Sequence, residues 1–235
     1  MSKRYTQPEV SKQPPDTRIN NISLGAFERR VLPWLAAKQP AWVMSDHLTW
    51  LGVLAAVLIG LFYWLTTYNL NWLWLVNLAL VLHWYADSLD GTLARFRHME
   101  RNIYGFYVDH HMDALSVLVI LLGLGLSPIM DLRVALLLLI AYFAMMIHVD
   151  LVSMCRETFK ISFGGFGPTE ARLVLIIGNI IIWSLNNPVY IFLGKSITLA
   201  SILGLFIALI ILSIFIVSGE IERRKIAKLD PGPDK

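Results

Sequence analysis

The chain has 235 residues, of which 56% are hydrophobic and 16% are charged, and its mean hydropathy is +0.59. Soluble domains average about 45–50% apolar and about 25% charged residues. The composition therefore excludes an ordinary soluble protein and predicts an integral membrane protein. The formal net charge of +3 gives no basis for a nucleic-acid partner. The single cysteine, Cys155, excludes an intrachain disulfide framework and a cysteine-rich zinc site.

The first 40 residues precede any long apolar stretch. Residues 1–21 mix Lys, Arg, Gln and Pro without the apolar core of about 7–15 residues that a signal peptide needs, so we expect a disordered tail. Residues 22–40 follow a helical pattern, because their apolar side chains recur at spacings of three and four: Leu24, Phe27, Val31 and Leu35. This pattern predicts an amphipathic helix in the membrane interface, and a solvated linker is the alternative.

Six later segments are long and apolar enough to cross a membrane, which takes about 20 residues each. They are Leu48–Thr67, Trp72–Leu89, Tyr104–Leu126, Leu132–Met154, Ala171–Leu193 and Ile197–Ser218. Asn186, Asn187 and Pro188 interrupt the fifth segment. The sequence thus predicts an all-α integral membrane protein, with residues 41–219 as one six-span domain and residues 220–235 as a cytoplasmic tail.

The Lys and Arg residues indicate how the spans are oriented. With the amino terminus in the cytoplasm, all 20 of these residues except Arg133 and Lys195 fall on the cytoplasmic side. Cytoplasmic loops carry the excess of basic residues, so we expect both termini in the cytoplasm. In a bacterium the protein would lie in the plasma or inner membrane.

Four carboxylates interrupt two neighbouring spans, where charge is costly and usually marks function. Asp87 and Asp90 are three residues apart at the end of the second span, and Asp109 and Asp113 are four apart in the third. Both spacings place a pair on one face of a helix. A short basic loop joins the two spans, so we expect antiparallel packing that brings the four acids together near the cytoplasmic side.

Four clustered carboxylates repel one another unless cations compensate them. Mg²⁺ or Mn²⁺ would do so, and two such ions about 3.5–4 Å apart can stabilise the attacking and leaving oxygens of a phosphoryl transfer. The small residues Gly91, Ala94 and Gly105 leave room for a ligand, and Arg95 is a cation available to phosphate. The alternative is a structural clamp of the acids by nearby arginines.

Written out, the stretch is Asp87-x-x-Asp90-Gly91-x-x-Ala94-Arg95, followed after nine residues by Gly105-x-x-x-Asp109-x-x-x-Asp113. It resembles the signature of the CDP-alcohol phosphotransferase (phosphatidyltransferase) family, membrane enzymes of phospholipid synthesis. Eight residues is the usual gap between its halves. A second segment, Asp46-His47-Leu48-Thr49-x-x-Gly52, resembles the family's Asn-x-x-Thr segment, with Asp46 in place of Asn.

The resemblance implies a reaction and a role for each matching residue. The enzyme would transfer a substituted phosphate group from a CDP-alcohol to the hydroxyl of a lipid or small polar alcohol and release CMP. Asp113 would be the general base and, with three other acids, would hold two Mg²⁺ or Mn²⁺ ions: Asp87, Asp90 and Asp109. The nucleotide would lie against Asp46, Thr49, Gly91, Ala94, Arg95 and Gly105. The family also implies a homodimer.

The identity of the alcohols stays open at this point. Gly164-Gly165-Phe166-Gly167-Pro168-Thr169-Glu170 resembles the Gly-Pro-x-Glu element of choline and ethanolamine phosphotransferases, in which Glu170 would hold an amine. The same residues also suit a turn and a helix cap. The length of the chain favours CDP-diacylglycerol as the donor, and CDP-choline or CDP-ethanolamine with diacylglycerol is the alternative. Candidate acceptor contacts are His110, Asp150, Glu170 and Arg172.

A cation transporter is the alternative from another functional class, because acidic residues within spans also mark ion pathways. Transport would favour broken helices with acids near the midplane of both halves. Here the acids are concentrated in one pair of spans, which favours the transferase.

Overall fold

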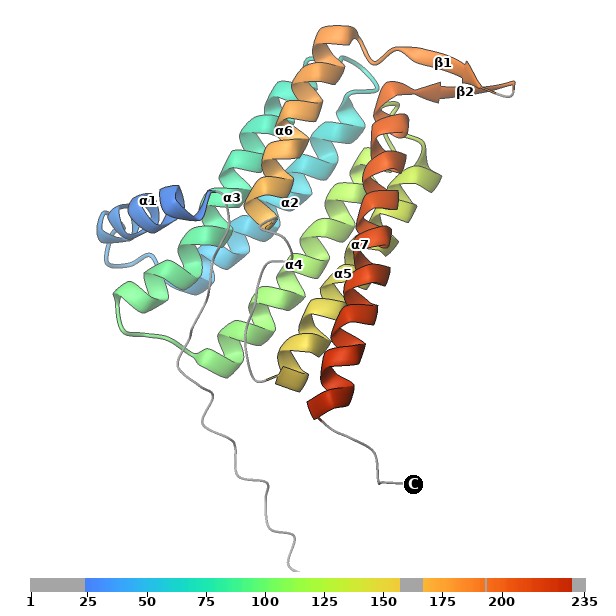
Figure 1. The fold of residues 1–235 in the computed structure, drawn as a ribbon. Helices are drawn as coiled ribbons and strands as arrows, with labels where there is room; N and C mark the ends of the chain where they lie inside the picture. The colour runs from blue at the N-terminus through green and yellow to red at the C-terminus, as the bar shows by residue number, and fades with distance from the viewer. Residues whose placement is uncertain (1–23, 157–166, 193, 230–235) are drawn as a thin grey trace, which may run out of the picture.

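The computed structural model describes residues 24–156, 167–192 and 194–229. These residues form seven helices and a two-stranded hairpin (Figure 1). The tail predicted for residues 1–21 lies outside them. The predicted helical architecture is confirmed, and the hairpin is an addition to it.

Six long helices run side by side as an elongated bundle (Figure 1). They are α2 (Ser45–Leu65), α3 (Trp72–Phe96), α4 (Asn102–Gly125), α5 (Leu132–Arg156), α6 (Pro168–Leu185) and α7 (Leu199–Leu229). The seventh, α1 (Gly25–Ala37), lies across the side of this bundle next to α3. Among the described residues, five helices are long and apolar enough to cross a membrane: α2, α4, α5, α6 and α7. The crossing by α3 stays a prediction.

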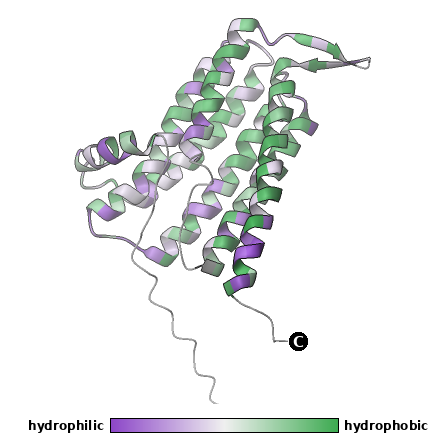
Figure 2. Cartoon of the chain, in the orientation of Figure 1, coloured by the Kyte–Doolittle hydropathy of each residue, from purple (hydrophilic) through white to green (hydrophobic). Residues whose placement is uncertain are grey.

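The distribution of polar residues follows the bundle axis. Hydrophobic residues dominate the end near the hairpin, and hydrophilic residues gather on α1 and at the opposite ends of α3, α4 and α7 (Figure 2).

Three polar side chains of the core, on three different helices, are joined to one another by hydrogen bonds. The buried Tyr63 hydroxyl donates to Asn179 Oδ1 over 3.0 Å, and Asn179 Nδ2 donates to Asn77 Oδ1 over 2.8 Å. These two bonds join α2, α6 and α3.

Two glycines let α2 and α4 come into backbone contact. A Cβ added at Gly123 would lie 2.3 Å from the Cα of Gly60 and 2.6 Å from its carbonyl oxygen. We expect Gly123→Ala to force the helices apart and to lower the free energy of unfolding by about 1–3 kcal/mol or more. Gly178→Ala in α6 is the matched control, because a Cβ there meets nothing within 4 Å. Equal melting temperatures for the two purified variants would contradict this packing.

The connection between α6 and α7 corrects the predicted bounds of two spans. The predicted span Ala171–Leu193 is too long, because α6 ends at Leu185. Asn186 and Asn187 adopt left-handed backbone angles, with φ of 57° and 44°, and asparagine tolerates this region better than most residues.

The chain then enters β1 (Val189–Phe192), which pairs antiparallel with β2 (Lys195–Thr198). The next predicted span begins too early, because α7 starts at Leu199. The helix itself continues beyond the predicted end of that span, Ser218, as far as Leu229.

Candidate metal and nucleotide site

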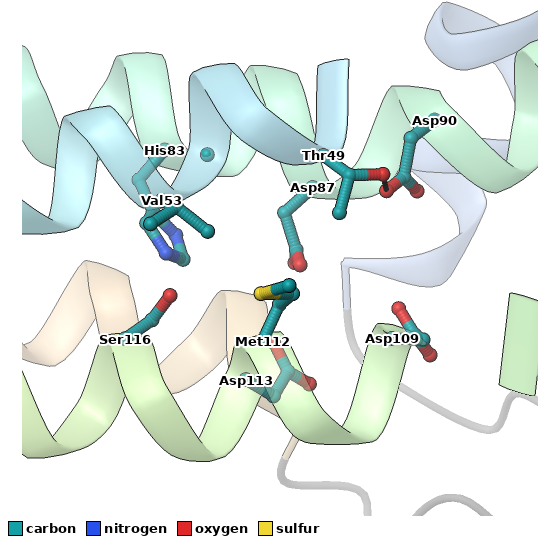
Figure 3. Close-up of a pocket in the computed structure, with 10 residues that line it drawn as sticks. Thr49, Val53, His83, Asp87, Asp90, Asp109, Met112, Asp113 and Ser116 are labelled. Carbon is teal, nitrogen blue, oxygen red and sulfur yellow. Dashed lines mark hydrogen bonds between the residues drawn. The ribbon is translucent and has the colours of Figure 1, made fainter. Parts of the chain in front are cut away.

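A pocket lies between α2, α3 and α4, in the half of the bundle that carries α1 (Figures 1 and 3). Its lining combines small, apolar and acidic residues from three helices: Thr49, Gly52, Val53, His83, Asp87, Asp90, Asp109, Met112, Asp113 and Ser116. All four acids of the predicted cluster are among them. The four acids therefore converge as the sequence predicts. The expected direct antiparallel packing of α3 against α4 is wrong, because each of these helices packs chiefly against α2 and the acids face one another across the pocket.

Three of the four acids form a group that fits a metal ion. One carboxylate oxygen each from Asp87, Asp109 and Asp113 lies within 4.8 Å of the other two. Figure 3 shows Asp87 on α3 facing Asp109 and Asp113 on α4. Carboxylate oxygens are the ligands that Mg²⁺ prefers. The donor set therefore suits a hard divalent cation.

Asp90 lines the same pocket but is drawn toward α2. Thr49 Oγ1 donates to Asp90 Oδ2 over 2.7 Å, and Ser45 Oγ donates to the backbone carbonyl of Asp90 over 3.0 Å. Figure 3 shows the Thr49 bond as a dashed line. Thr49 thus contacts a carboxylate of the pocket directly. The family resemblance predicts only a nucleotide contact for Thr49.

Arg172 of α6 makes an ion pair with the acid cluster. Its Nη2 donates to Asp87 Oδ2 over 2.6 Å, and its Nε donates to His83 Nδ1 over 3.0 Å. His83 is buried and Arg172 keeps only 11% of its side-chain exposure. The guanidinium therefore neutralises one carboxylate of the group. The sequence predicts only an acceptor contact for Arg172. Its ion pair with Asp87 could not be predicted, because nothing local in the sequence shows which helix α6 packs against.

The other residues predicted to bind the nucleotide lie near the start of α2, the end of α3 and the start of α4. Asp46, in the first turn of α2, makes a salt bridge with Arg101, whose guanidinium lies 3.9 Å from the centre of the Tyr104 ring. The hydrogen bond to Asp46 raises the pKa of Arg101 above its usual value. Arg95 Nη2 lies 3.3 Å from Thr92 Oγ1.

Small residues keep the backbone open beside these charged groups. A Cβ added at Gly91 would meet the Arg95 guanidinium at 3.4 Å, so this side chain folds back over Gly91. A Cβ at Gly105 would meet nothing within 4 Å, and Ala94 is partly exposed.

The predicted acceptor contacts separate into two places. His110 Nε2 lies 3.5 Å from Asp150 Oδ1, which links α4 to α5 beside the acid cluster. Glu170 instead binds two backbone N–H groups, with Oε1 accepting from Leu24 and Oε2 from Gly167. It caps α6 and does not line the pocket. Residues 164–166 of the segment predicted to contain it lie outside the described residues.

Comparison with known proteins agrees with the resemblance drawn from the motif. Residues 42–215 match a family model described as CDP-alcohol phosphatidyltransferase. A phosphatidylinositol phosphate synthase from Cutibacterium acnes (strain DSM 16379 / KPA171202) is 33% identical over 88 residues. That segment is 37% of this chain and 39% of the relative, so the chain matches well under two thirds of the relative's length. The long apolar helices and the match to a family of membrane transferases together make this an integral membrane protein.

Proposed function

Because this chain belongs to the CDP-alcohol phosphatidyltransferase family, we propose that it transfers a phosphatidyl group from CDP-diacylglycerol to an acceptor hydroxyl and releases CMP. The observation that carries the proposal is the group formed by Asp87, Asp109 and Asp113 in a pocket that the fourth acid of the signature, Asp90, and Thr49 also line. The four acids of the signature thus line one pocket, although they lie on two different helices.

The pocket fits the divalent ions that the resemblance implies. Asp87, Asp109 and Asp113 would hold Mg²⁺ or Mn²⁺, with Asp90 beside them on α3. We propose two ions, which when bound neutralise the charge of the pyrophosphate and make CMP a better leaving group. Arg172 already balances one carboxylate, so the protein itself supplies part of the compensating charge.

The residues around the pocket suit the diphosphate group of a CDP-alcohol. Gly91 has no side chain, so phosphate oxygens can approach the backbone of α3 closely. Arg95 is exposed at the end of the same helix and can swing from Thr92 to a phosphate. Thr49 holds the carboxylate of Asp90 in place through a 2.7 Å hydrogen bond.

Asp113 is placed to act as the general base. It lies one turn deeper in α4 than Asp109 and faces the same pocket. One of its carboxylate oxygens would serve the ions, and the other would accept the proton of the acceptor hydroxyl. The hydroxyl oxygen forms a bond to the β-phosphorus of CDP-diacylglycerol as the pyrophosphate P–O bond breaks, and CMP leaves with the bonding pair.

The placement of Glu170 favours the CDP-diacylglycerol reading over an aminoalcohol transferase. Its two oxygens accept hydrogen bonds from the backbone N–H groups of Leu24 and Gly167, so neither is turned toward the pocket to hold an amine. Because the C. acnes relative is a phosphatidylinositol phosphate synthase, inositol phosphate is one of the acceptors to test.

The orientation in the membrane is part of the same proposal. If α3 crosses the membrane with the other five long helices, both termini lie on one side, and the basic residues place that side in the cytoplasm. The helix segments that line the pocket lie toward the α1 end of the bundle, away from the β1–β2 hairpin (Figure 1). It would therefore open toward the cytoplasm, where CMP is released.

Release of CMP by the detergent-purified full chain in Mn²⁺ tests the proposal. One arm supplies CDP-diacylglycerol with serine, inositol phosphate or glycerol phosphate in turn, and the other supplies CDP-choline or CDP-ethanolamine with diacylglycerol. We expect CMP only in the first arm. Turnover confined to the second arm would make this an aminoalcohol phosphotransferase and would contradict CDP-diacylglycerol as the donor. Mn²⁺ transport into vesicles without CMP release would contradict a transferase altogether.

A further inference from the structure

Glu28 on α1 accepts hydrogen bonds from side chains on two other helices, α3 and α6. Glu28 Oε1 accepts a hydrogen bond from Trp84 Nε1 of α3 over 3.0 Å and another from Thr169 Oγ1 of α6 over 2.7 Å. The Phe27 ring stacks on the Trp84 ring, with centroids 6.2 Å apart. A single glutamate on the helix outside the bundle therefore fixes two helices of the bundle relative to each other.

Both donors lie one turn from the charged pair of the pocket. Trp84 precedes Asp87 by three residues on α3, and Thr169 precedes Arg172 by three residues on α6. Residues three apart share a face of a helix. The Glu28 bridge thus holds together the two helix segments that bring Arg172 to Asp87 over 2.6 Å.

The first turn of α6 depends on α1 for its position more than the rest of the helix does. Further along, α6 is bound to α3 by the buried Asn179–Asn77 hydrogen bond and by Trp183 Nε1, which donates to Asn71 Oδ1 over 2.9 Å. At its start, Pro168 is the first helical residue, and the polar contacts there lead to α1: Thr169 to Glu28, and Glu170 to the backbone N–H of Leu24.

We infer that Glu28 is a positioning residue for the pocket, because its bridge between Trp84 and Thr169 sets the first turn of α6 so that Arg172 meets Asp87. Glu28 touches neither the ions nor the substrate in this role. The inference predicts an energetic coupling between Glu28 and Arg172, two residues that no hydrogen bond or ion pair joins directly. The inference takes the metal site from the proposed function, but its test measures Mn²⁺ binding and does not depend on turnover.

The coupling can be measured through Mn²⁺ affinity. Arg172 is a cation bound to a proposed metal ligand, so Arg172→Met should strengthen Mn²⁺ binding by the full-length purified chain. Glu28→Leu releases Arg172 from its fixed place. It should therefore also strengthen Mn²⁺ binding and lower the Mn²⁺ Kd by about three- to tenfold. Free Mn²⁺ is read directly by electron paramagnetic resonance. General loss of structure would weaken binding instead.

A double-mutant cycle separates positioning from independent effects. Glu28→Leu should have no further effect on the Mn²⁺ Kd once Arg172→Met is present. Glu28→Gln keeps an acceptor oxygen and should bind Mn²⁺ like the wild type, as should Arg30→Ala, an exposed charge on the same helix. If Glu28→Leu does not yield folded protein, Thr169→Val removes one arm of the bridge and should shift the Kd in the same direction.

Two results would overturn the inference. One is an unchanged Mn²⁺ Kd in Glu28→Leu or, failing that variant, in Thr169→Val. The other is a Glu28→Leu effect that persists in full in the Arg172→Met background. If the cycle shows coupling but no CDP-alcohol yields CMP, the proposed function fails and the positioning role stands. If CMP is released but the coupling is absent, the proposed function stands and the positioning role fails.

Discussion

Asp113→Asn should abolish turnover while nucleotide binding persists. The substitution keeps the size of the side chain and one oxygen, but the amide cannot take the proton of the acceptor hydroxyl. A positioned general base contributes about 10²- to 10⁴-fold in rate, so we expect CMP release to fall by at least that factor. The measurement pairs CMP release with the rise in melting temperature that CDP produces in Mn²⁺.

The matched control makes the same exchange outside the pocket. Asp131 lies between α4 and α5, and its hydrogen bonds to Arg133 hold the pKa of its carboxyl at about 2. It is therefore ionised at any assay pH, and Asp131→Asn also removes a full negative charge. This variant should keep its activity. If Asp113→Asn loses nucleotide stabilisation as well as turnover, its two oxygens do not divide the roles of ligand and base.

Arg172→Met should destabilise the metal-free protein and increase the stabilisation that Mn²⁺ provides. The ion pair with Asp87 is mostly buried, with 11% and 23% of the two side chains exposed. Removing one partner of a buried pair costs about 3–5 kcal/mol, because the other charge stays buried without compensation. Mn²⁺ restores a positive charge beside Asp87, so it should recover part of that loss.

Melting temperatures with and without Mn²⁺ test this for the variant and the wild type. The metal-free variant should melt several degrees lower, and Mn²⁺ should raise its melting temperature more than that of the wild type. Arg223→Met is the control, because Arg223 pairs with Glu220 on the exposed end of α7 and such pairs contribute little. A smaller Mn²⁺ increment in Arg172→Met would mean that Arg172 supports the metal site and does not compete with it.

Local spacing predicted most of the acid cluster. Asp109 and Asp113 are four residues apart on one helix, and a five-residue turn brings Asp87 to face them. The fourth acid, Asp90, turns toward α2 because Thr49 donates to it. Only the family resemblance placed Thr49 near this site. The spacing of residues within α2 and α3 does not show which turns of the two helices lie side by side.

Long-range contacts account for what the sequence did not predict. Arg172 is 85 residues from Asp87 and Thr169 is 141 from Glu28, and hydropathy patterns say nothing about which helices become neighbours. The hairpin was missed for a different reason. Its first strand, Val189–Phe192, is as apolar as the helices beside it, so hydropathy alone extends the fifth predicted span over it. The left-handed Asn186 and Asn187 end the helix earlier.

The most direct test of this metal site is an anomalous diffraction map from crystals grown with Mn²⁺ and CDP. We expect manganese peaks in the pocket, about 2.1 Å from carboxylate oxygens of Asp87, Asp109 and Asp113, with the pyrophosphate of CDP beside Gly91. A map with CDP bound in the pocket and no manganese peak among these carboxylates would contradict it. So would manganese bound only elsewhere on the chain.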